Sequence, residues 1–196
     1  FAYLDKDIQE ETIVLLTDLE VSSILEELYS DDAADMLEEM PANVVNRILR
    51  NSTTADRKKI NELLQYPDDS AGSIMTIEYV DLKTHMSVSE AFERIRRTGV
   101  DKETVYTCYV IDQSRYLLGI VSVKDLLLND TTCVIEDIME ENIIFAYTYD
   151  DKEEVVDKFQ KYDLTVLPVV DKENRLVGIV TVDDAIDVLQ EEASED

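Results

Sequence analysis

The sequence predicts an α+β protein of several domains, in which an all-α helical superhelix precedes a duplicated unit of short strands and helices. Three observations predict this organisation. Residues 1–66 contain no glycine and repeat apolar residues at intervals of three and four. Strands and helices alternate after residue 66, and one segment of that half recurs 59 positions later. The 196 residues are enough for separate small domains, each with a core of its own.

The first 66 residues are expected to form short helices. Their apolar positions have helical spacing, and turn or capping residues interrupt them at regular intervals. Breaks are expected at residues 18–22, residues 30–32, Pro41 and residues 52–54. Each break offers a side-chain oxygen for an N-cap, or a proline suited to a first helical turn. Helices this short cannot bury a face alone, so a stacked superhelix is predicted.

The turn-rich segment 66–73 marks the expected domain boundary, and the pattern changes beyond it. Short β-branched or aromatic runs predict strands at residues 104–111, 117–121, 143–148, 165–170 and 176–180. Helical spacing is found at residues 88–97, 123–128, 153–162 and 182–193.

An internal repeat is the most informative feature of the second half. Residues 110–125 align without gaps with residues 169–184, and both copies end in Gly-x-x-Ser/Thr-x-x-Asp. These motif residues are Gly119, Ser122 and Asp125 in the first copy and Gly178, Thr181 and Asp184 in the second. Ile74-Met75 and Ile138-Met139 also correspond, with about five extra residues in the first copy near positions 99–106. Each copy is therefore expected to form one βαββα-type unit.

The composition is strongly acidic, with 45 Asp and Glu against 18 Lys and Arg and a net charge of −27. Nucleic acid and anionic membranes need a basic patch, so neither is an expected partner, and cations are. Residues 1–66 carry −9, residues 67–135 carry −4 and residues 136–196 carry −14. We expect a chain that is soluble as given, because no apolar run is long enough to span a membrane. Cys108 and Cys133 are expected to be buried free thiols.

The last predicted helix combines an apolar side with a carboxylate stripe. Asp187, Glu191 and Glu195 fall within about 60° of Asp184 on a helical wheel, opposite Ala185 and the other apolar residues. Like charges at these spacings oppose the helix, and no Lys or Arg follows Arg175. Two interpretations remain open. The stripe is either a solvated face or a surface that binds Mg²⁺, which prefers hard oxygen ligands.

No enzyme is predicted. His85 is the single histidine and lies in an expected loop, without a nearby nucleophile in a recognisable arrangement. The four glycines are too far apart to build a phosphate-binding loop, and no EF-hand sequence is present.

The duplicated motif resembles that of tandem CBS domains over residues 73–193. This resemblance implies that Ser122 and Asp125, and likewise Thr181 and Asp184, hold the ribose of an adenine nucleotide such as ATP. The alternative interpretation is a purely structural capping box at each helix start. The first motif contains Lys124 where the second has Asp183, so a phosphate is expected to favour the cleft that contains Asp125.

A second resemblance extends over the whole chain. The helical half with DDAADMLEEM at 31–40, the junction YPDDSAG at 66–72 and the acidic end at 181–196 are similar to the cytosolic part of MgtE-family magnesium transporters. The resemblance implies four parts: a helical N domain at 1–66, a first CBS domain at 67–135, a second at 136–193, and the start of a connecting helix at 194–196.

The family resemblance also implies a function and a ligand set. We expect a Mg²⁺-sensing regulatory region on the cytoplasmic side of the cell membrane, in which Mg²⁺ bridges acidic surfaces and favours a closed pore. The expected partners are a second copy, bound through the CBS domains, and the protein's own transmembrane domain. The alternative is an adenine-nucleotide-sensing CBS module. The implied metal ligands are Asp32, Glu153, Asp163, Asp184, Asp187, Glu192 and Glu195, with backbone oxygens at Ser73 and Gln160. For Asp32, N-capping of its helix is an equal alternative.

Overall fold

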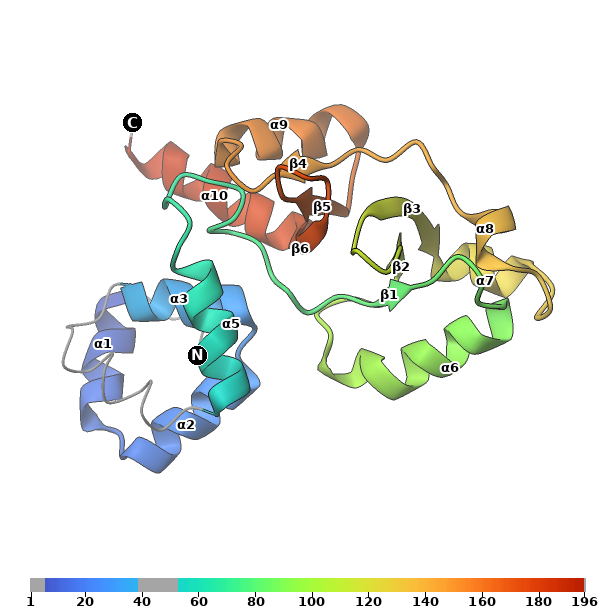
Figure 1. The fold of residues 1–196 in the computed structure, drawn as a ribbon. Helices are drawn as coiled ribbons and strands as arrows, with labels where there is room; N and C mark the ends of the chain where they lie inside the picture. Colours follow the sequence, from blue (N-terminus) through green and yellow to red (C-terminus); the bar gives the residue numbers. More distant parts are fainter. Residues whose placement is uncertain (1–5, 39–52, 196) are drawn as a thin grey trace. The chain divides into compact units, whose positions relative to one another are not determined.

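The structure is a computed structural model that describes residues 6–38 and 53–195. The chain divides into two compact units, Phe1–Pro67 and Asp68–Asp196. Each unit is described separately below, with the labels of Figure 1.

The first unit is helical, as the glycine-free pattern predicts. Its described helices are α1 (Lys6–Leu15), α2 (Asp18–Glu27), α3 (Ser30–Glu38) and α5 (Thr54–Leu63). Their apolar stripes form one buried cluster of Ile13, Val21, Leu25, Ala33, Met36, Leu37 and Ile60. Helices α3 and α5 pack against each other in this cluster. The unit therefore builds its core from helices that are each too short to be stable alone.

The expected break at residues 18–22 is wrong, because those residues lie inside α2. The chain turns at Leu16 and Thr17 instead. Thr17 and Glu20 form a capping box, in which the Thr17 N–H donates to Glu20 Oε2 at 2.9 Å and the Glu20 N–H donates to Thr17 Oγ1 at 3.4 Å. The expected break at Pro41 lies outside the described residues.

The second unit holds both copies of the repeat (Figure 1). The first copy contains β1 (Asp81–Leu82), α6 (Val88–Thr98), the 3₁₀-helix η1 (Gly99–Asp101), β2 (Thr107–Ile111), β3 (Leu117–Ser122) and α7 (Val123–Leu128). The short helix α8 (Ile135–Ile138) lies in the segment before the second copy and packs with the first sheet. The second contains β4 (Ala146–Tyr147), α9 (Lys152–Tyr162), β5 (Val166–Val170), β6 (Leu176–Thr181) and α10 (Val182–Glu195). Each copy forms a three-stranded sheet in which the first pairing is parallel and the second antiparallel.

The two antiparallel hairpins are equivalent, as the repeat predicts. Asp112 and Asp171 each accept hydrogen bonds from two backbone N–H groups of their own turns. Arg115 and Asn174 occupy the same turn position with positive φ values of 69° and 61°. Short polar side chains that bond their own backbone favour such turns, which explains why the pattern occurs in both copies.

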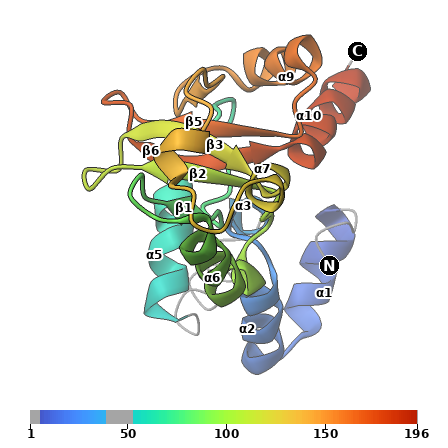
Figure 2. The same ribbon diagram turned by 90° about the vertical axis from the view of Figure 1, so that its right-hand side faces the viewer.

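The hairpin turns of the two copies also meet. The Leu176 N–H donates to Arg115 O at 2.9 Å, and the Leu117 N–H donates to Asn174 O at 3.2 Å. A shared apolar cluster lies between the copies and contains Tyr79, Tyr109, Ile111, Leu176 and Ile179. In Figure 2 the two sheets lie between the helices of the first copy and those of the second. The pair therefore folds as one unit around an approximate internal symmetry.

The segment before each copy pairs with the sheet of the other copy. Thr76 bridges to Ile179 of β6, and Glu140 bridges to Ile120 of β3. A Cβ added at Gly178 would lie 2.6 Å from Met75 Sδ, and one at Gly119 would lie 2.7 Å from Met139 Sδ. The Cβ at Gly178 would also lie 2.8 Å from the backbone oxygen of Thr76, so the crossing segment requires glycine there, whereas the close atoms at Gly119 all belong to the Met139 side chain. Residues 135–140 consequently pack with the first sheet.

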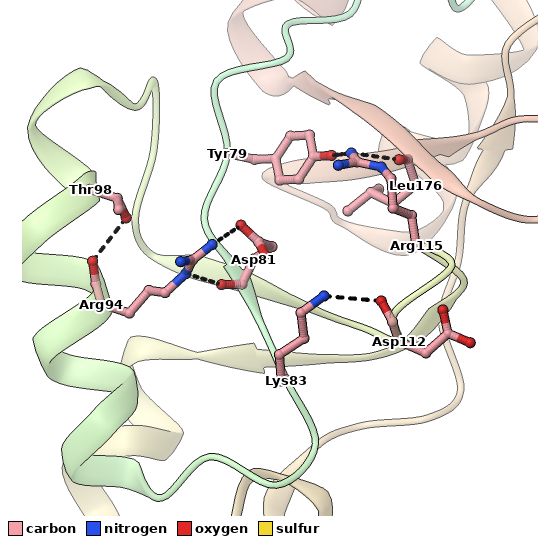
Figure 3. A network of polar contacts seen from close by, with 8 residues as sticks. All are labelled: Tyr79, Asp81, Lys83, Arg94, Thr98, Asp112, Arg115 and Leu176. Atoms are coloured by element: carbon pink, nitrogen blue, oxygen red, sulfur yellow. Dashed lines mark hydrogen bonds and ion pairs between the residues drawn. The ribbon is translucent and has the colours of Figure 1, made fainter.

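Polar contacts fix β1 to its surroundings (Figure 3). The Arg94 guanidinium of α6 donates to Asp81 O at 2.9 Å and to Asp81 Oδ1 at 2.6 Å. Arg115 donates to the Tyr79 hydroxyl and, at 3.0 Å, to Leu176 O of the other copy. These bonds join the first sheet both to its covering helix and to the second copy.

The sequence pattern misses three short elements and overestimates a fourth. Strand β1, the 3₁₀-helix η1 and helix α8 are not predicted by it, and β4 covers only Ala146–Tyr147 of the strand expected at 143–148. Two-residue strands have too few positions for an alternating pattern. Both cysteines are free thiols as expected, but only Cys108 is buried, and Cys133 is half-buried.

Candidate functional site

Helix α10 carries the carboxylate stripe that the sequence predicts. Asp183, Asp187 and Glu191 are exposed, as expected. The expected core side is only partly correct, because Ala185 is buried together with Val188, whereas Ile186 and Leu189 are 43% and 37% exposed. Partial burial, and then the charges of Glu191 and Asp183, raise the pKa of Asp187 above the ordinary aspartate value. The carboxylates thus repel one another within the folded protein.

One cation contacts this stripe from the neighbouring helix. Lys152, the first residue of α9, has its Nζ 3.7 Å from Glu191 Oε2 and 3.7 Å from Asp69 Oδ1. The two helices pack side by side, and the strand order makes them antiparallel. The end of α9 therefore lies toward the start of α10. We call the surface that carries Asp163 at the end of α9 and Asp183, Asp184, Asp187 and Glu191 on α10 the acidic face.

Asp184 begins the acidic face and also caps α10. Its Oδ2 accepts hydrogen bonds from the Thr181 hydroxyl at 2.6 Å and from the Thr181 N–H at 3.1 Å. This is the geometry of a capping box, the structural interpretation that the sequence offers for this motif. Both of these capping bonds engage Oδ2 of the Asp184 carboxylate.

The C-terminus of α9 contributes two further expected ligands. Asp163 is the C-cap in a left-handed conformation, with φ 52° and ψ 48°. The N–H groups of Asp163 and Leu164 both donate to Phe159 O, so Leu164 does not close the usual bond to Gln160 O. The Gln160 carbonyl consequently lies at the negative end of the helix dipole, beside an exposed carboxylate.

Glu153 lies at the other end of α9. Asp151 is the N-cap, and its Oδ1 accepts from the Glu153 N–H at 2.8 Å. Glu153 itself is an exposed residue of the first turn, where a negative charge is favourable without any metal. The structure therefore separates Glu153 from Gln160 and Asp163 by the length of the helix.

Ser73 lies with the second copy, although it precedes the first in the sequence. Its turn bonds to β4 and the residues that follow, through Gly72 N–H to Thr148 O at 2.8 Å and Ala71 N–H to Asp150 O at 2.7 Å. The Ser73 hydroxyl lies 2.7 Å from Ser70 O and from Asp68 O, to which it donates.

The remaining expected ligands lie in the helical unit and near the end of α10. Asp32 belongs to the first turn of α3 in the helical unit, a position that favours negative charge. Glu192 and Glu195 belong to α10, but their side chains lie outside the described part of the structure.

The first motif has the same capping geometry in more open surroundings. The Ser122 hydroxyl donates to Asp125 Oδ2 at 2.5 Å, and the Asp125 N–H donates to Ser122 Oγ at 3.0 Å. Asp125 and Lys124 are exposed, whereas Thr181 of the second motif is buried. Ser122 and Asp125 are therefore more accessible than their equivalents, since Ser122 is half-buried where Thr181 is buried, and Asp125 is exposed where Asp184 is half-buried.

Sequence reasoning missed two side chains at these motifs. Glu103 Oε1 lies 3.5 Å from Thr181 Oγ1, across the boundary between the two copies. Lys152 contacts Glu191 from another helix. Both contacts join residues far apart in the chain, so no local spacing could have indicated them.

The architecture defines a regulatory pair of CBS domains joined to a helical domain, because two βαββα-type sheets meet around an internal symmetry and each ends in the hydroxyl–acid motif. The CBS domain profile matches residues 71–130 and 135–191. The profile of the MgtE intracellular N domain matches residues 1–69.

Comparison with known proteins gives the family. The chain is 42% identical over 170 residues to the magnesium transporter MgtE of Thermus thermophilus, a match that covers 85% of this chain and 38% of that protein. MgtE of Enterococcus faecalis is 41% identical over 138 residues, which cover 70% and 30% respectively. The chain belongs to the MgtE family of magnesium transporters.

Solved structures agree with this assignment. The soluble part of a magnesium transporter superposes with a TM-score of 0.92 at 34% identity, covering 95% of this chain and 73% of that one. The cytosolic domain of the Mg²⁺ channel MgtE in complex with ATP gives 0.92 at 39% identity, covering 95% and 77%. This chain corresponds to that transporter region, which is not an enzyme.

The chain spans 38% of the Thermus thermophilus protein and 30% of the Enterococcus faecalis protein. Among residues 6–38 and 53–195, no helix has the length and apolar composition needed to cross a membrane.

Proposed function

We propose that this chain is the Mg²⁺-sensing regulatory region of a magnesium transporter, and that the acidic face of α9 and α10 binds the ion. One observation carries the proposal. Partial burial, and then the charges of its α10 neighbours Glu191 and Asp183, raise the pKa of Asp187. A divalent cation at this face relieves their repulsion, and carboxylate oxygens are the ligands that Mg²⁺ takes.

The C-terminus of α9 supports the same site. Asp163 adopts a left-handed backbone that disfavours non-glycine residues, and its charge opposes the negative end of the helix dipole. Both effects cost stability in the absence of a cation. Mg²⁺ offsets the electrostatic cost when Asp163 and the Gln160 carbonyl face it, directly or through bound waters.

Mg²⁺ binding regulates the conformation of the chain if the ion also binds the helical N domain. Residues 1–66 and 136–196 hold most of the net charge, so they repel each other when no cation is present. Mg²⁺ bound between them, with Asp32 as the N-domain ligand, favours a compact state. We propose that this state closes the pore of the attached transmembrane domain, and that loss of Mg²⁺ opens it. Only a difference in Mg²⁺ affinity between the two states can shift their populations.

Calorimetric Mg²⁺ titration tests the site. Asp184→Asn combined with Asp187→Asn should weaken Mg²⁺ binding by at least about tenfold, since two charges leave the face while the Asn side chain still caps α10. Glu136→Gln is the matched control, because Glu136 is an exposed acid on α8, which packs with the sheet of the first copy. Equal Mg²⁺ affinities of the double variant and the wild type would contradict Mg²⁺ binding at the proposed site.

ATP is proposed as a second ligand. A related MgtE cytosolic domain has been solved in complex with ATP. In this chain the first motif offers the Ser122 hydroxyl, the Asp125 carboxylate and the exposed Lys124 ammonium. These groups suit a ribose and a phosphate. Asp125→Ala should abolish ATP binding measured by calorimetry, whereas Glu136→Gln should leave it unchanged.

A second copy of the chain is the proposed protein partner. Leu127 and Leu128 of α7 are 69% and 75% exposed, and Ile186 and Leu189 of the equivalent helix α10 are also exposed. Burial of these side chains against a second CBS pair would remove apolar surface from water. Sedimentation should therefore report a dimer for the wild type and a monomer for Leu127→Glu with Leu128→Glu. A wild-type monomer at all concentrations would contradict the proposed homodimer.

A further inference from the structure

The ammonium group of Lys152 lies between two carboxylates and forms a close pair with neither. Its Nζ is 3.7 Å from Asp69 Oδ1 and 3.7 Å from Glu191 Oε2. Both distances exceed the range of about 2.7–3.2 Å that an N–H···O hydrogen bond adopts. A change of charge at one carboxylate should therefore move the ammonium toward the other.

Backbone hydrogen bonds hold Asp69 beside Lys152. The Lys152 N–H donates to Asp69 O at 2.9 Å, and the Ala71 N–H donates to Asp150 O at 2.7 Å. Asp69 is the second residue after Pro67, where the helical unit ends. The junction between the helical unit and the CBS pair thus supplies a carboxylate at the start of α9.

The exposure of the three side chains indicates which of them can be changed without disturbing the fold. The Lys152 side chain is only 20% exposed, whereas those of Asp69 and Glu191 are 84% and 55% exposed. Substitution of an exposed side chain such as Asp69 usually has little effect on stability. A change in ion binding caused by such a substitution therefore reports on charge.

The Lys152 ammonium competes with any cation that binds at the acidic face near Glu191. It has three donors and no acceptor, and it repels a second positive charge. Asp69 attracts the ammonium from the side opposite to Glu191 and so weakens this competition. Without the Asp69 charge, the ammonium should approach the Glu191 carboxylate to hydrogen-bond distance and oppose the cation more strongly.

We propose that Asp69 is a positioning residue of the Mg²⁺ site, which holds the Lys152 ammonium away from Glu191 and thereby raises the Mg²⁺ affinity of the acidic face. The proposal rests on the Mg²⁺ function proposed above. Asp69 acts through Lys152 and is not a ligand of the ion. A residue of the domain junction thus adjusts the affinity of the ion site on α10.

A double-mutant cycle tests this role, with Mg²⁺ affinities measured by calorimetry. Asp69→Asn should weaken Mg²⁺ binding about two- to threefold, the size of a partly screened ion pair. In a Lys152→Gln chain the same change should have no larger effect than Asp68→Asn, because no ammonium is left to move. Asp68→Asn is the matched control, since it removes an exposed charge one residue away. Asp69→Glu, which keeps the charge, should retain the wild-type affinity.

Equal weakening by Asp69→Asn in both backgrounds would overturn the proposal, because the carboxylate would then act on Mg²⁺ without Lys152. No weakening in the wild-type background would overturn it as well. A crystal structure of Asp69→Asn in EDTA provides a readout without the ion. Lys152 Nζ should move from 3.7 Å to about 3 Å from a Glu191 carboxylate oxygen, and an unchanged distance would contradict the proposal. A wild-type chain that binds no Mg²⁺ would instead refute the proposed function, while the variant structure would still locate the ammonium.

Discussion

The ammonium nitrogen of Lys152 lies 3.7 Å from a carboxylate oxygen of Glu191, so a cation from α9 reaches the carboxylates of α10. The Lys152 side chain is 20% exposed and that of Glu191 is 55% exposed. Such a pair contributes only about 0 to 1 kcal/mol to stability. The larger effect of Lys152 is to make the electrostatic potential at the acidic face less negative.

Replacing Lys152 should therefore tighten Mg²⁺ binding. Lys152→Gln removes a positive charge that competes with the ion, and we expect an affinity about two- to fivefold higher, the size of a partly screened charge pair. Calorimetric titration at low ionic strength measures the effect, with Lys172→Gln as a control at an exposed lysine of the β5–β6 turn. Weaker binding in Lys152→Gln would contradict Mg²⁺ binding at this face.

The pH dependence of stability should change in Asp187→Asn. A carboxyl group whose pKa is raised by folding binds more protons in the folded state than in the unfolded state near that pKa. Its charged form therefore destabilises the fold as pH rises above the ordinary value of 3.8. Without Mg²⁺, Asp187→Asn should unfold at a higher temperature than the wild type near neutral pH, and the difference should vanish in acid. A variant less stable than the wild type at neutral pH would contradict the repulsion.

Asp163→Gly tests the backbone role of Asp163 as a left-handed C-cap separately from the role of its carboxylate charge. Glycine adopts the left-handed conformation freely, so the free energy of unfolding in EDTA should rise by up to about 1 kcal/mol. The same change should weaken Mg²⁺ binding, because a carboxylate is lost. Asn174→Gly is the matched control at a φ of 61° in a hairpin turn, and it should leave Mg²⁺ affinity unchanged. Unaltered Mg²⁺ binding in Asp163→Gly would exclude this residue as a ligand.

The Tyr109 hydroxyl gives a stability prediction within the CBS pair. Tyr109 is fully buried between the two copies, and its hydroxyl is one of the buried side-chain atoms that lack a hydrogen-bond partner in the described residues. Tyr109→Phe removes that unpaired group and keeps the ring against Tyr79, so it should raise the free energy of unfolding by roughly 1 kcal/mol. Urea denaturation measures the change, and a loss of that size would imply a partner for the hydroxyl.

Cys108 should resist modification. Burial raises the pKa of its thiol to about 12, so almost no thiolate exists at neutral pH. Iodoacetamide should therefore leave Cys108 unlabelled in the folded chain and label it in urea, as mass spectrometry of peptides can establish. Rapid labelling of the folded chain would contradict the buried position.

The repeat explains how much of the fold could be predicted. The identical spacing of Asp112 and Asp171, and of Gly119 and Gly178, is sufficient to predict both hairpins and both motifs from the sequence. The start of α2 is misplaced by the sequence pattern, although Thr17 and Glu20 have the spacing of a capping box. Strand β1 is missed because two residues carry no periodicity.

The candidate site is predictable where its residues share a helix. Asp184, Asp187 and Glu191 follow helical spacing, so their common stripe is evident from the sequence. The contacts of Glu191 with Lys152 and of Thr181 with Glu103 depend on how helices and copies pack. The position of Ser73 beside the second copy depends on a crossing segment in the same way. Such long-range relations have no local signal in a single sequence.

Small-angle X-ray scattering with and without Mg²⁺ tests the central claim most directly. In the wild-type chain, Mg²⁺ should reduce the radius of gyration as the helical domain and the CBS pair draw together. The reduction should be absent in Asp184→Asn with Asp187→Asn and retained in Glu136→Gln. A wild-type chain whose radius of gyration is the same in EDTA and in saturating Mg²⁺, measured at matched ionic strength, would contradict the Mg²⁺ switch.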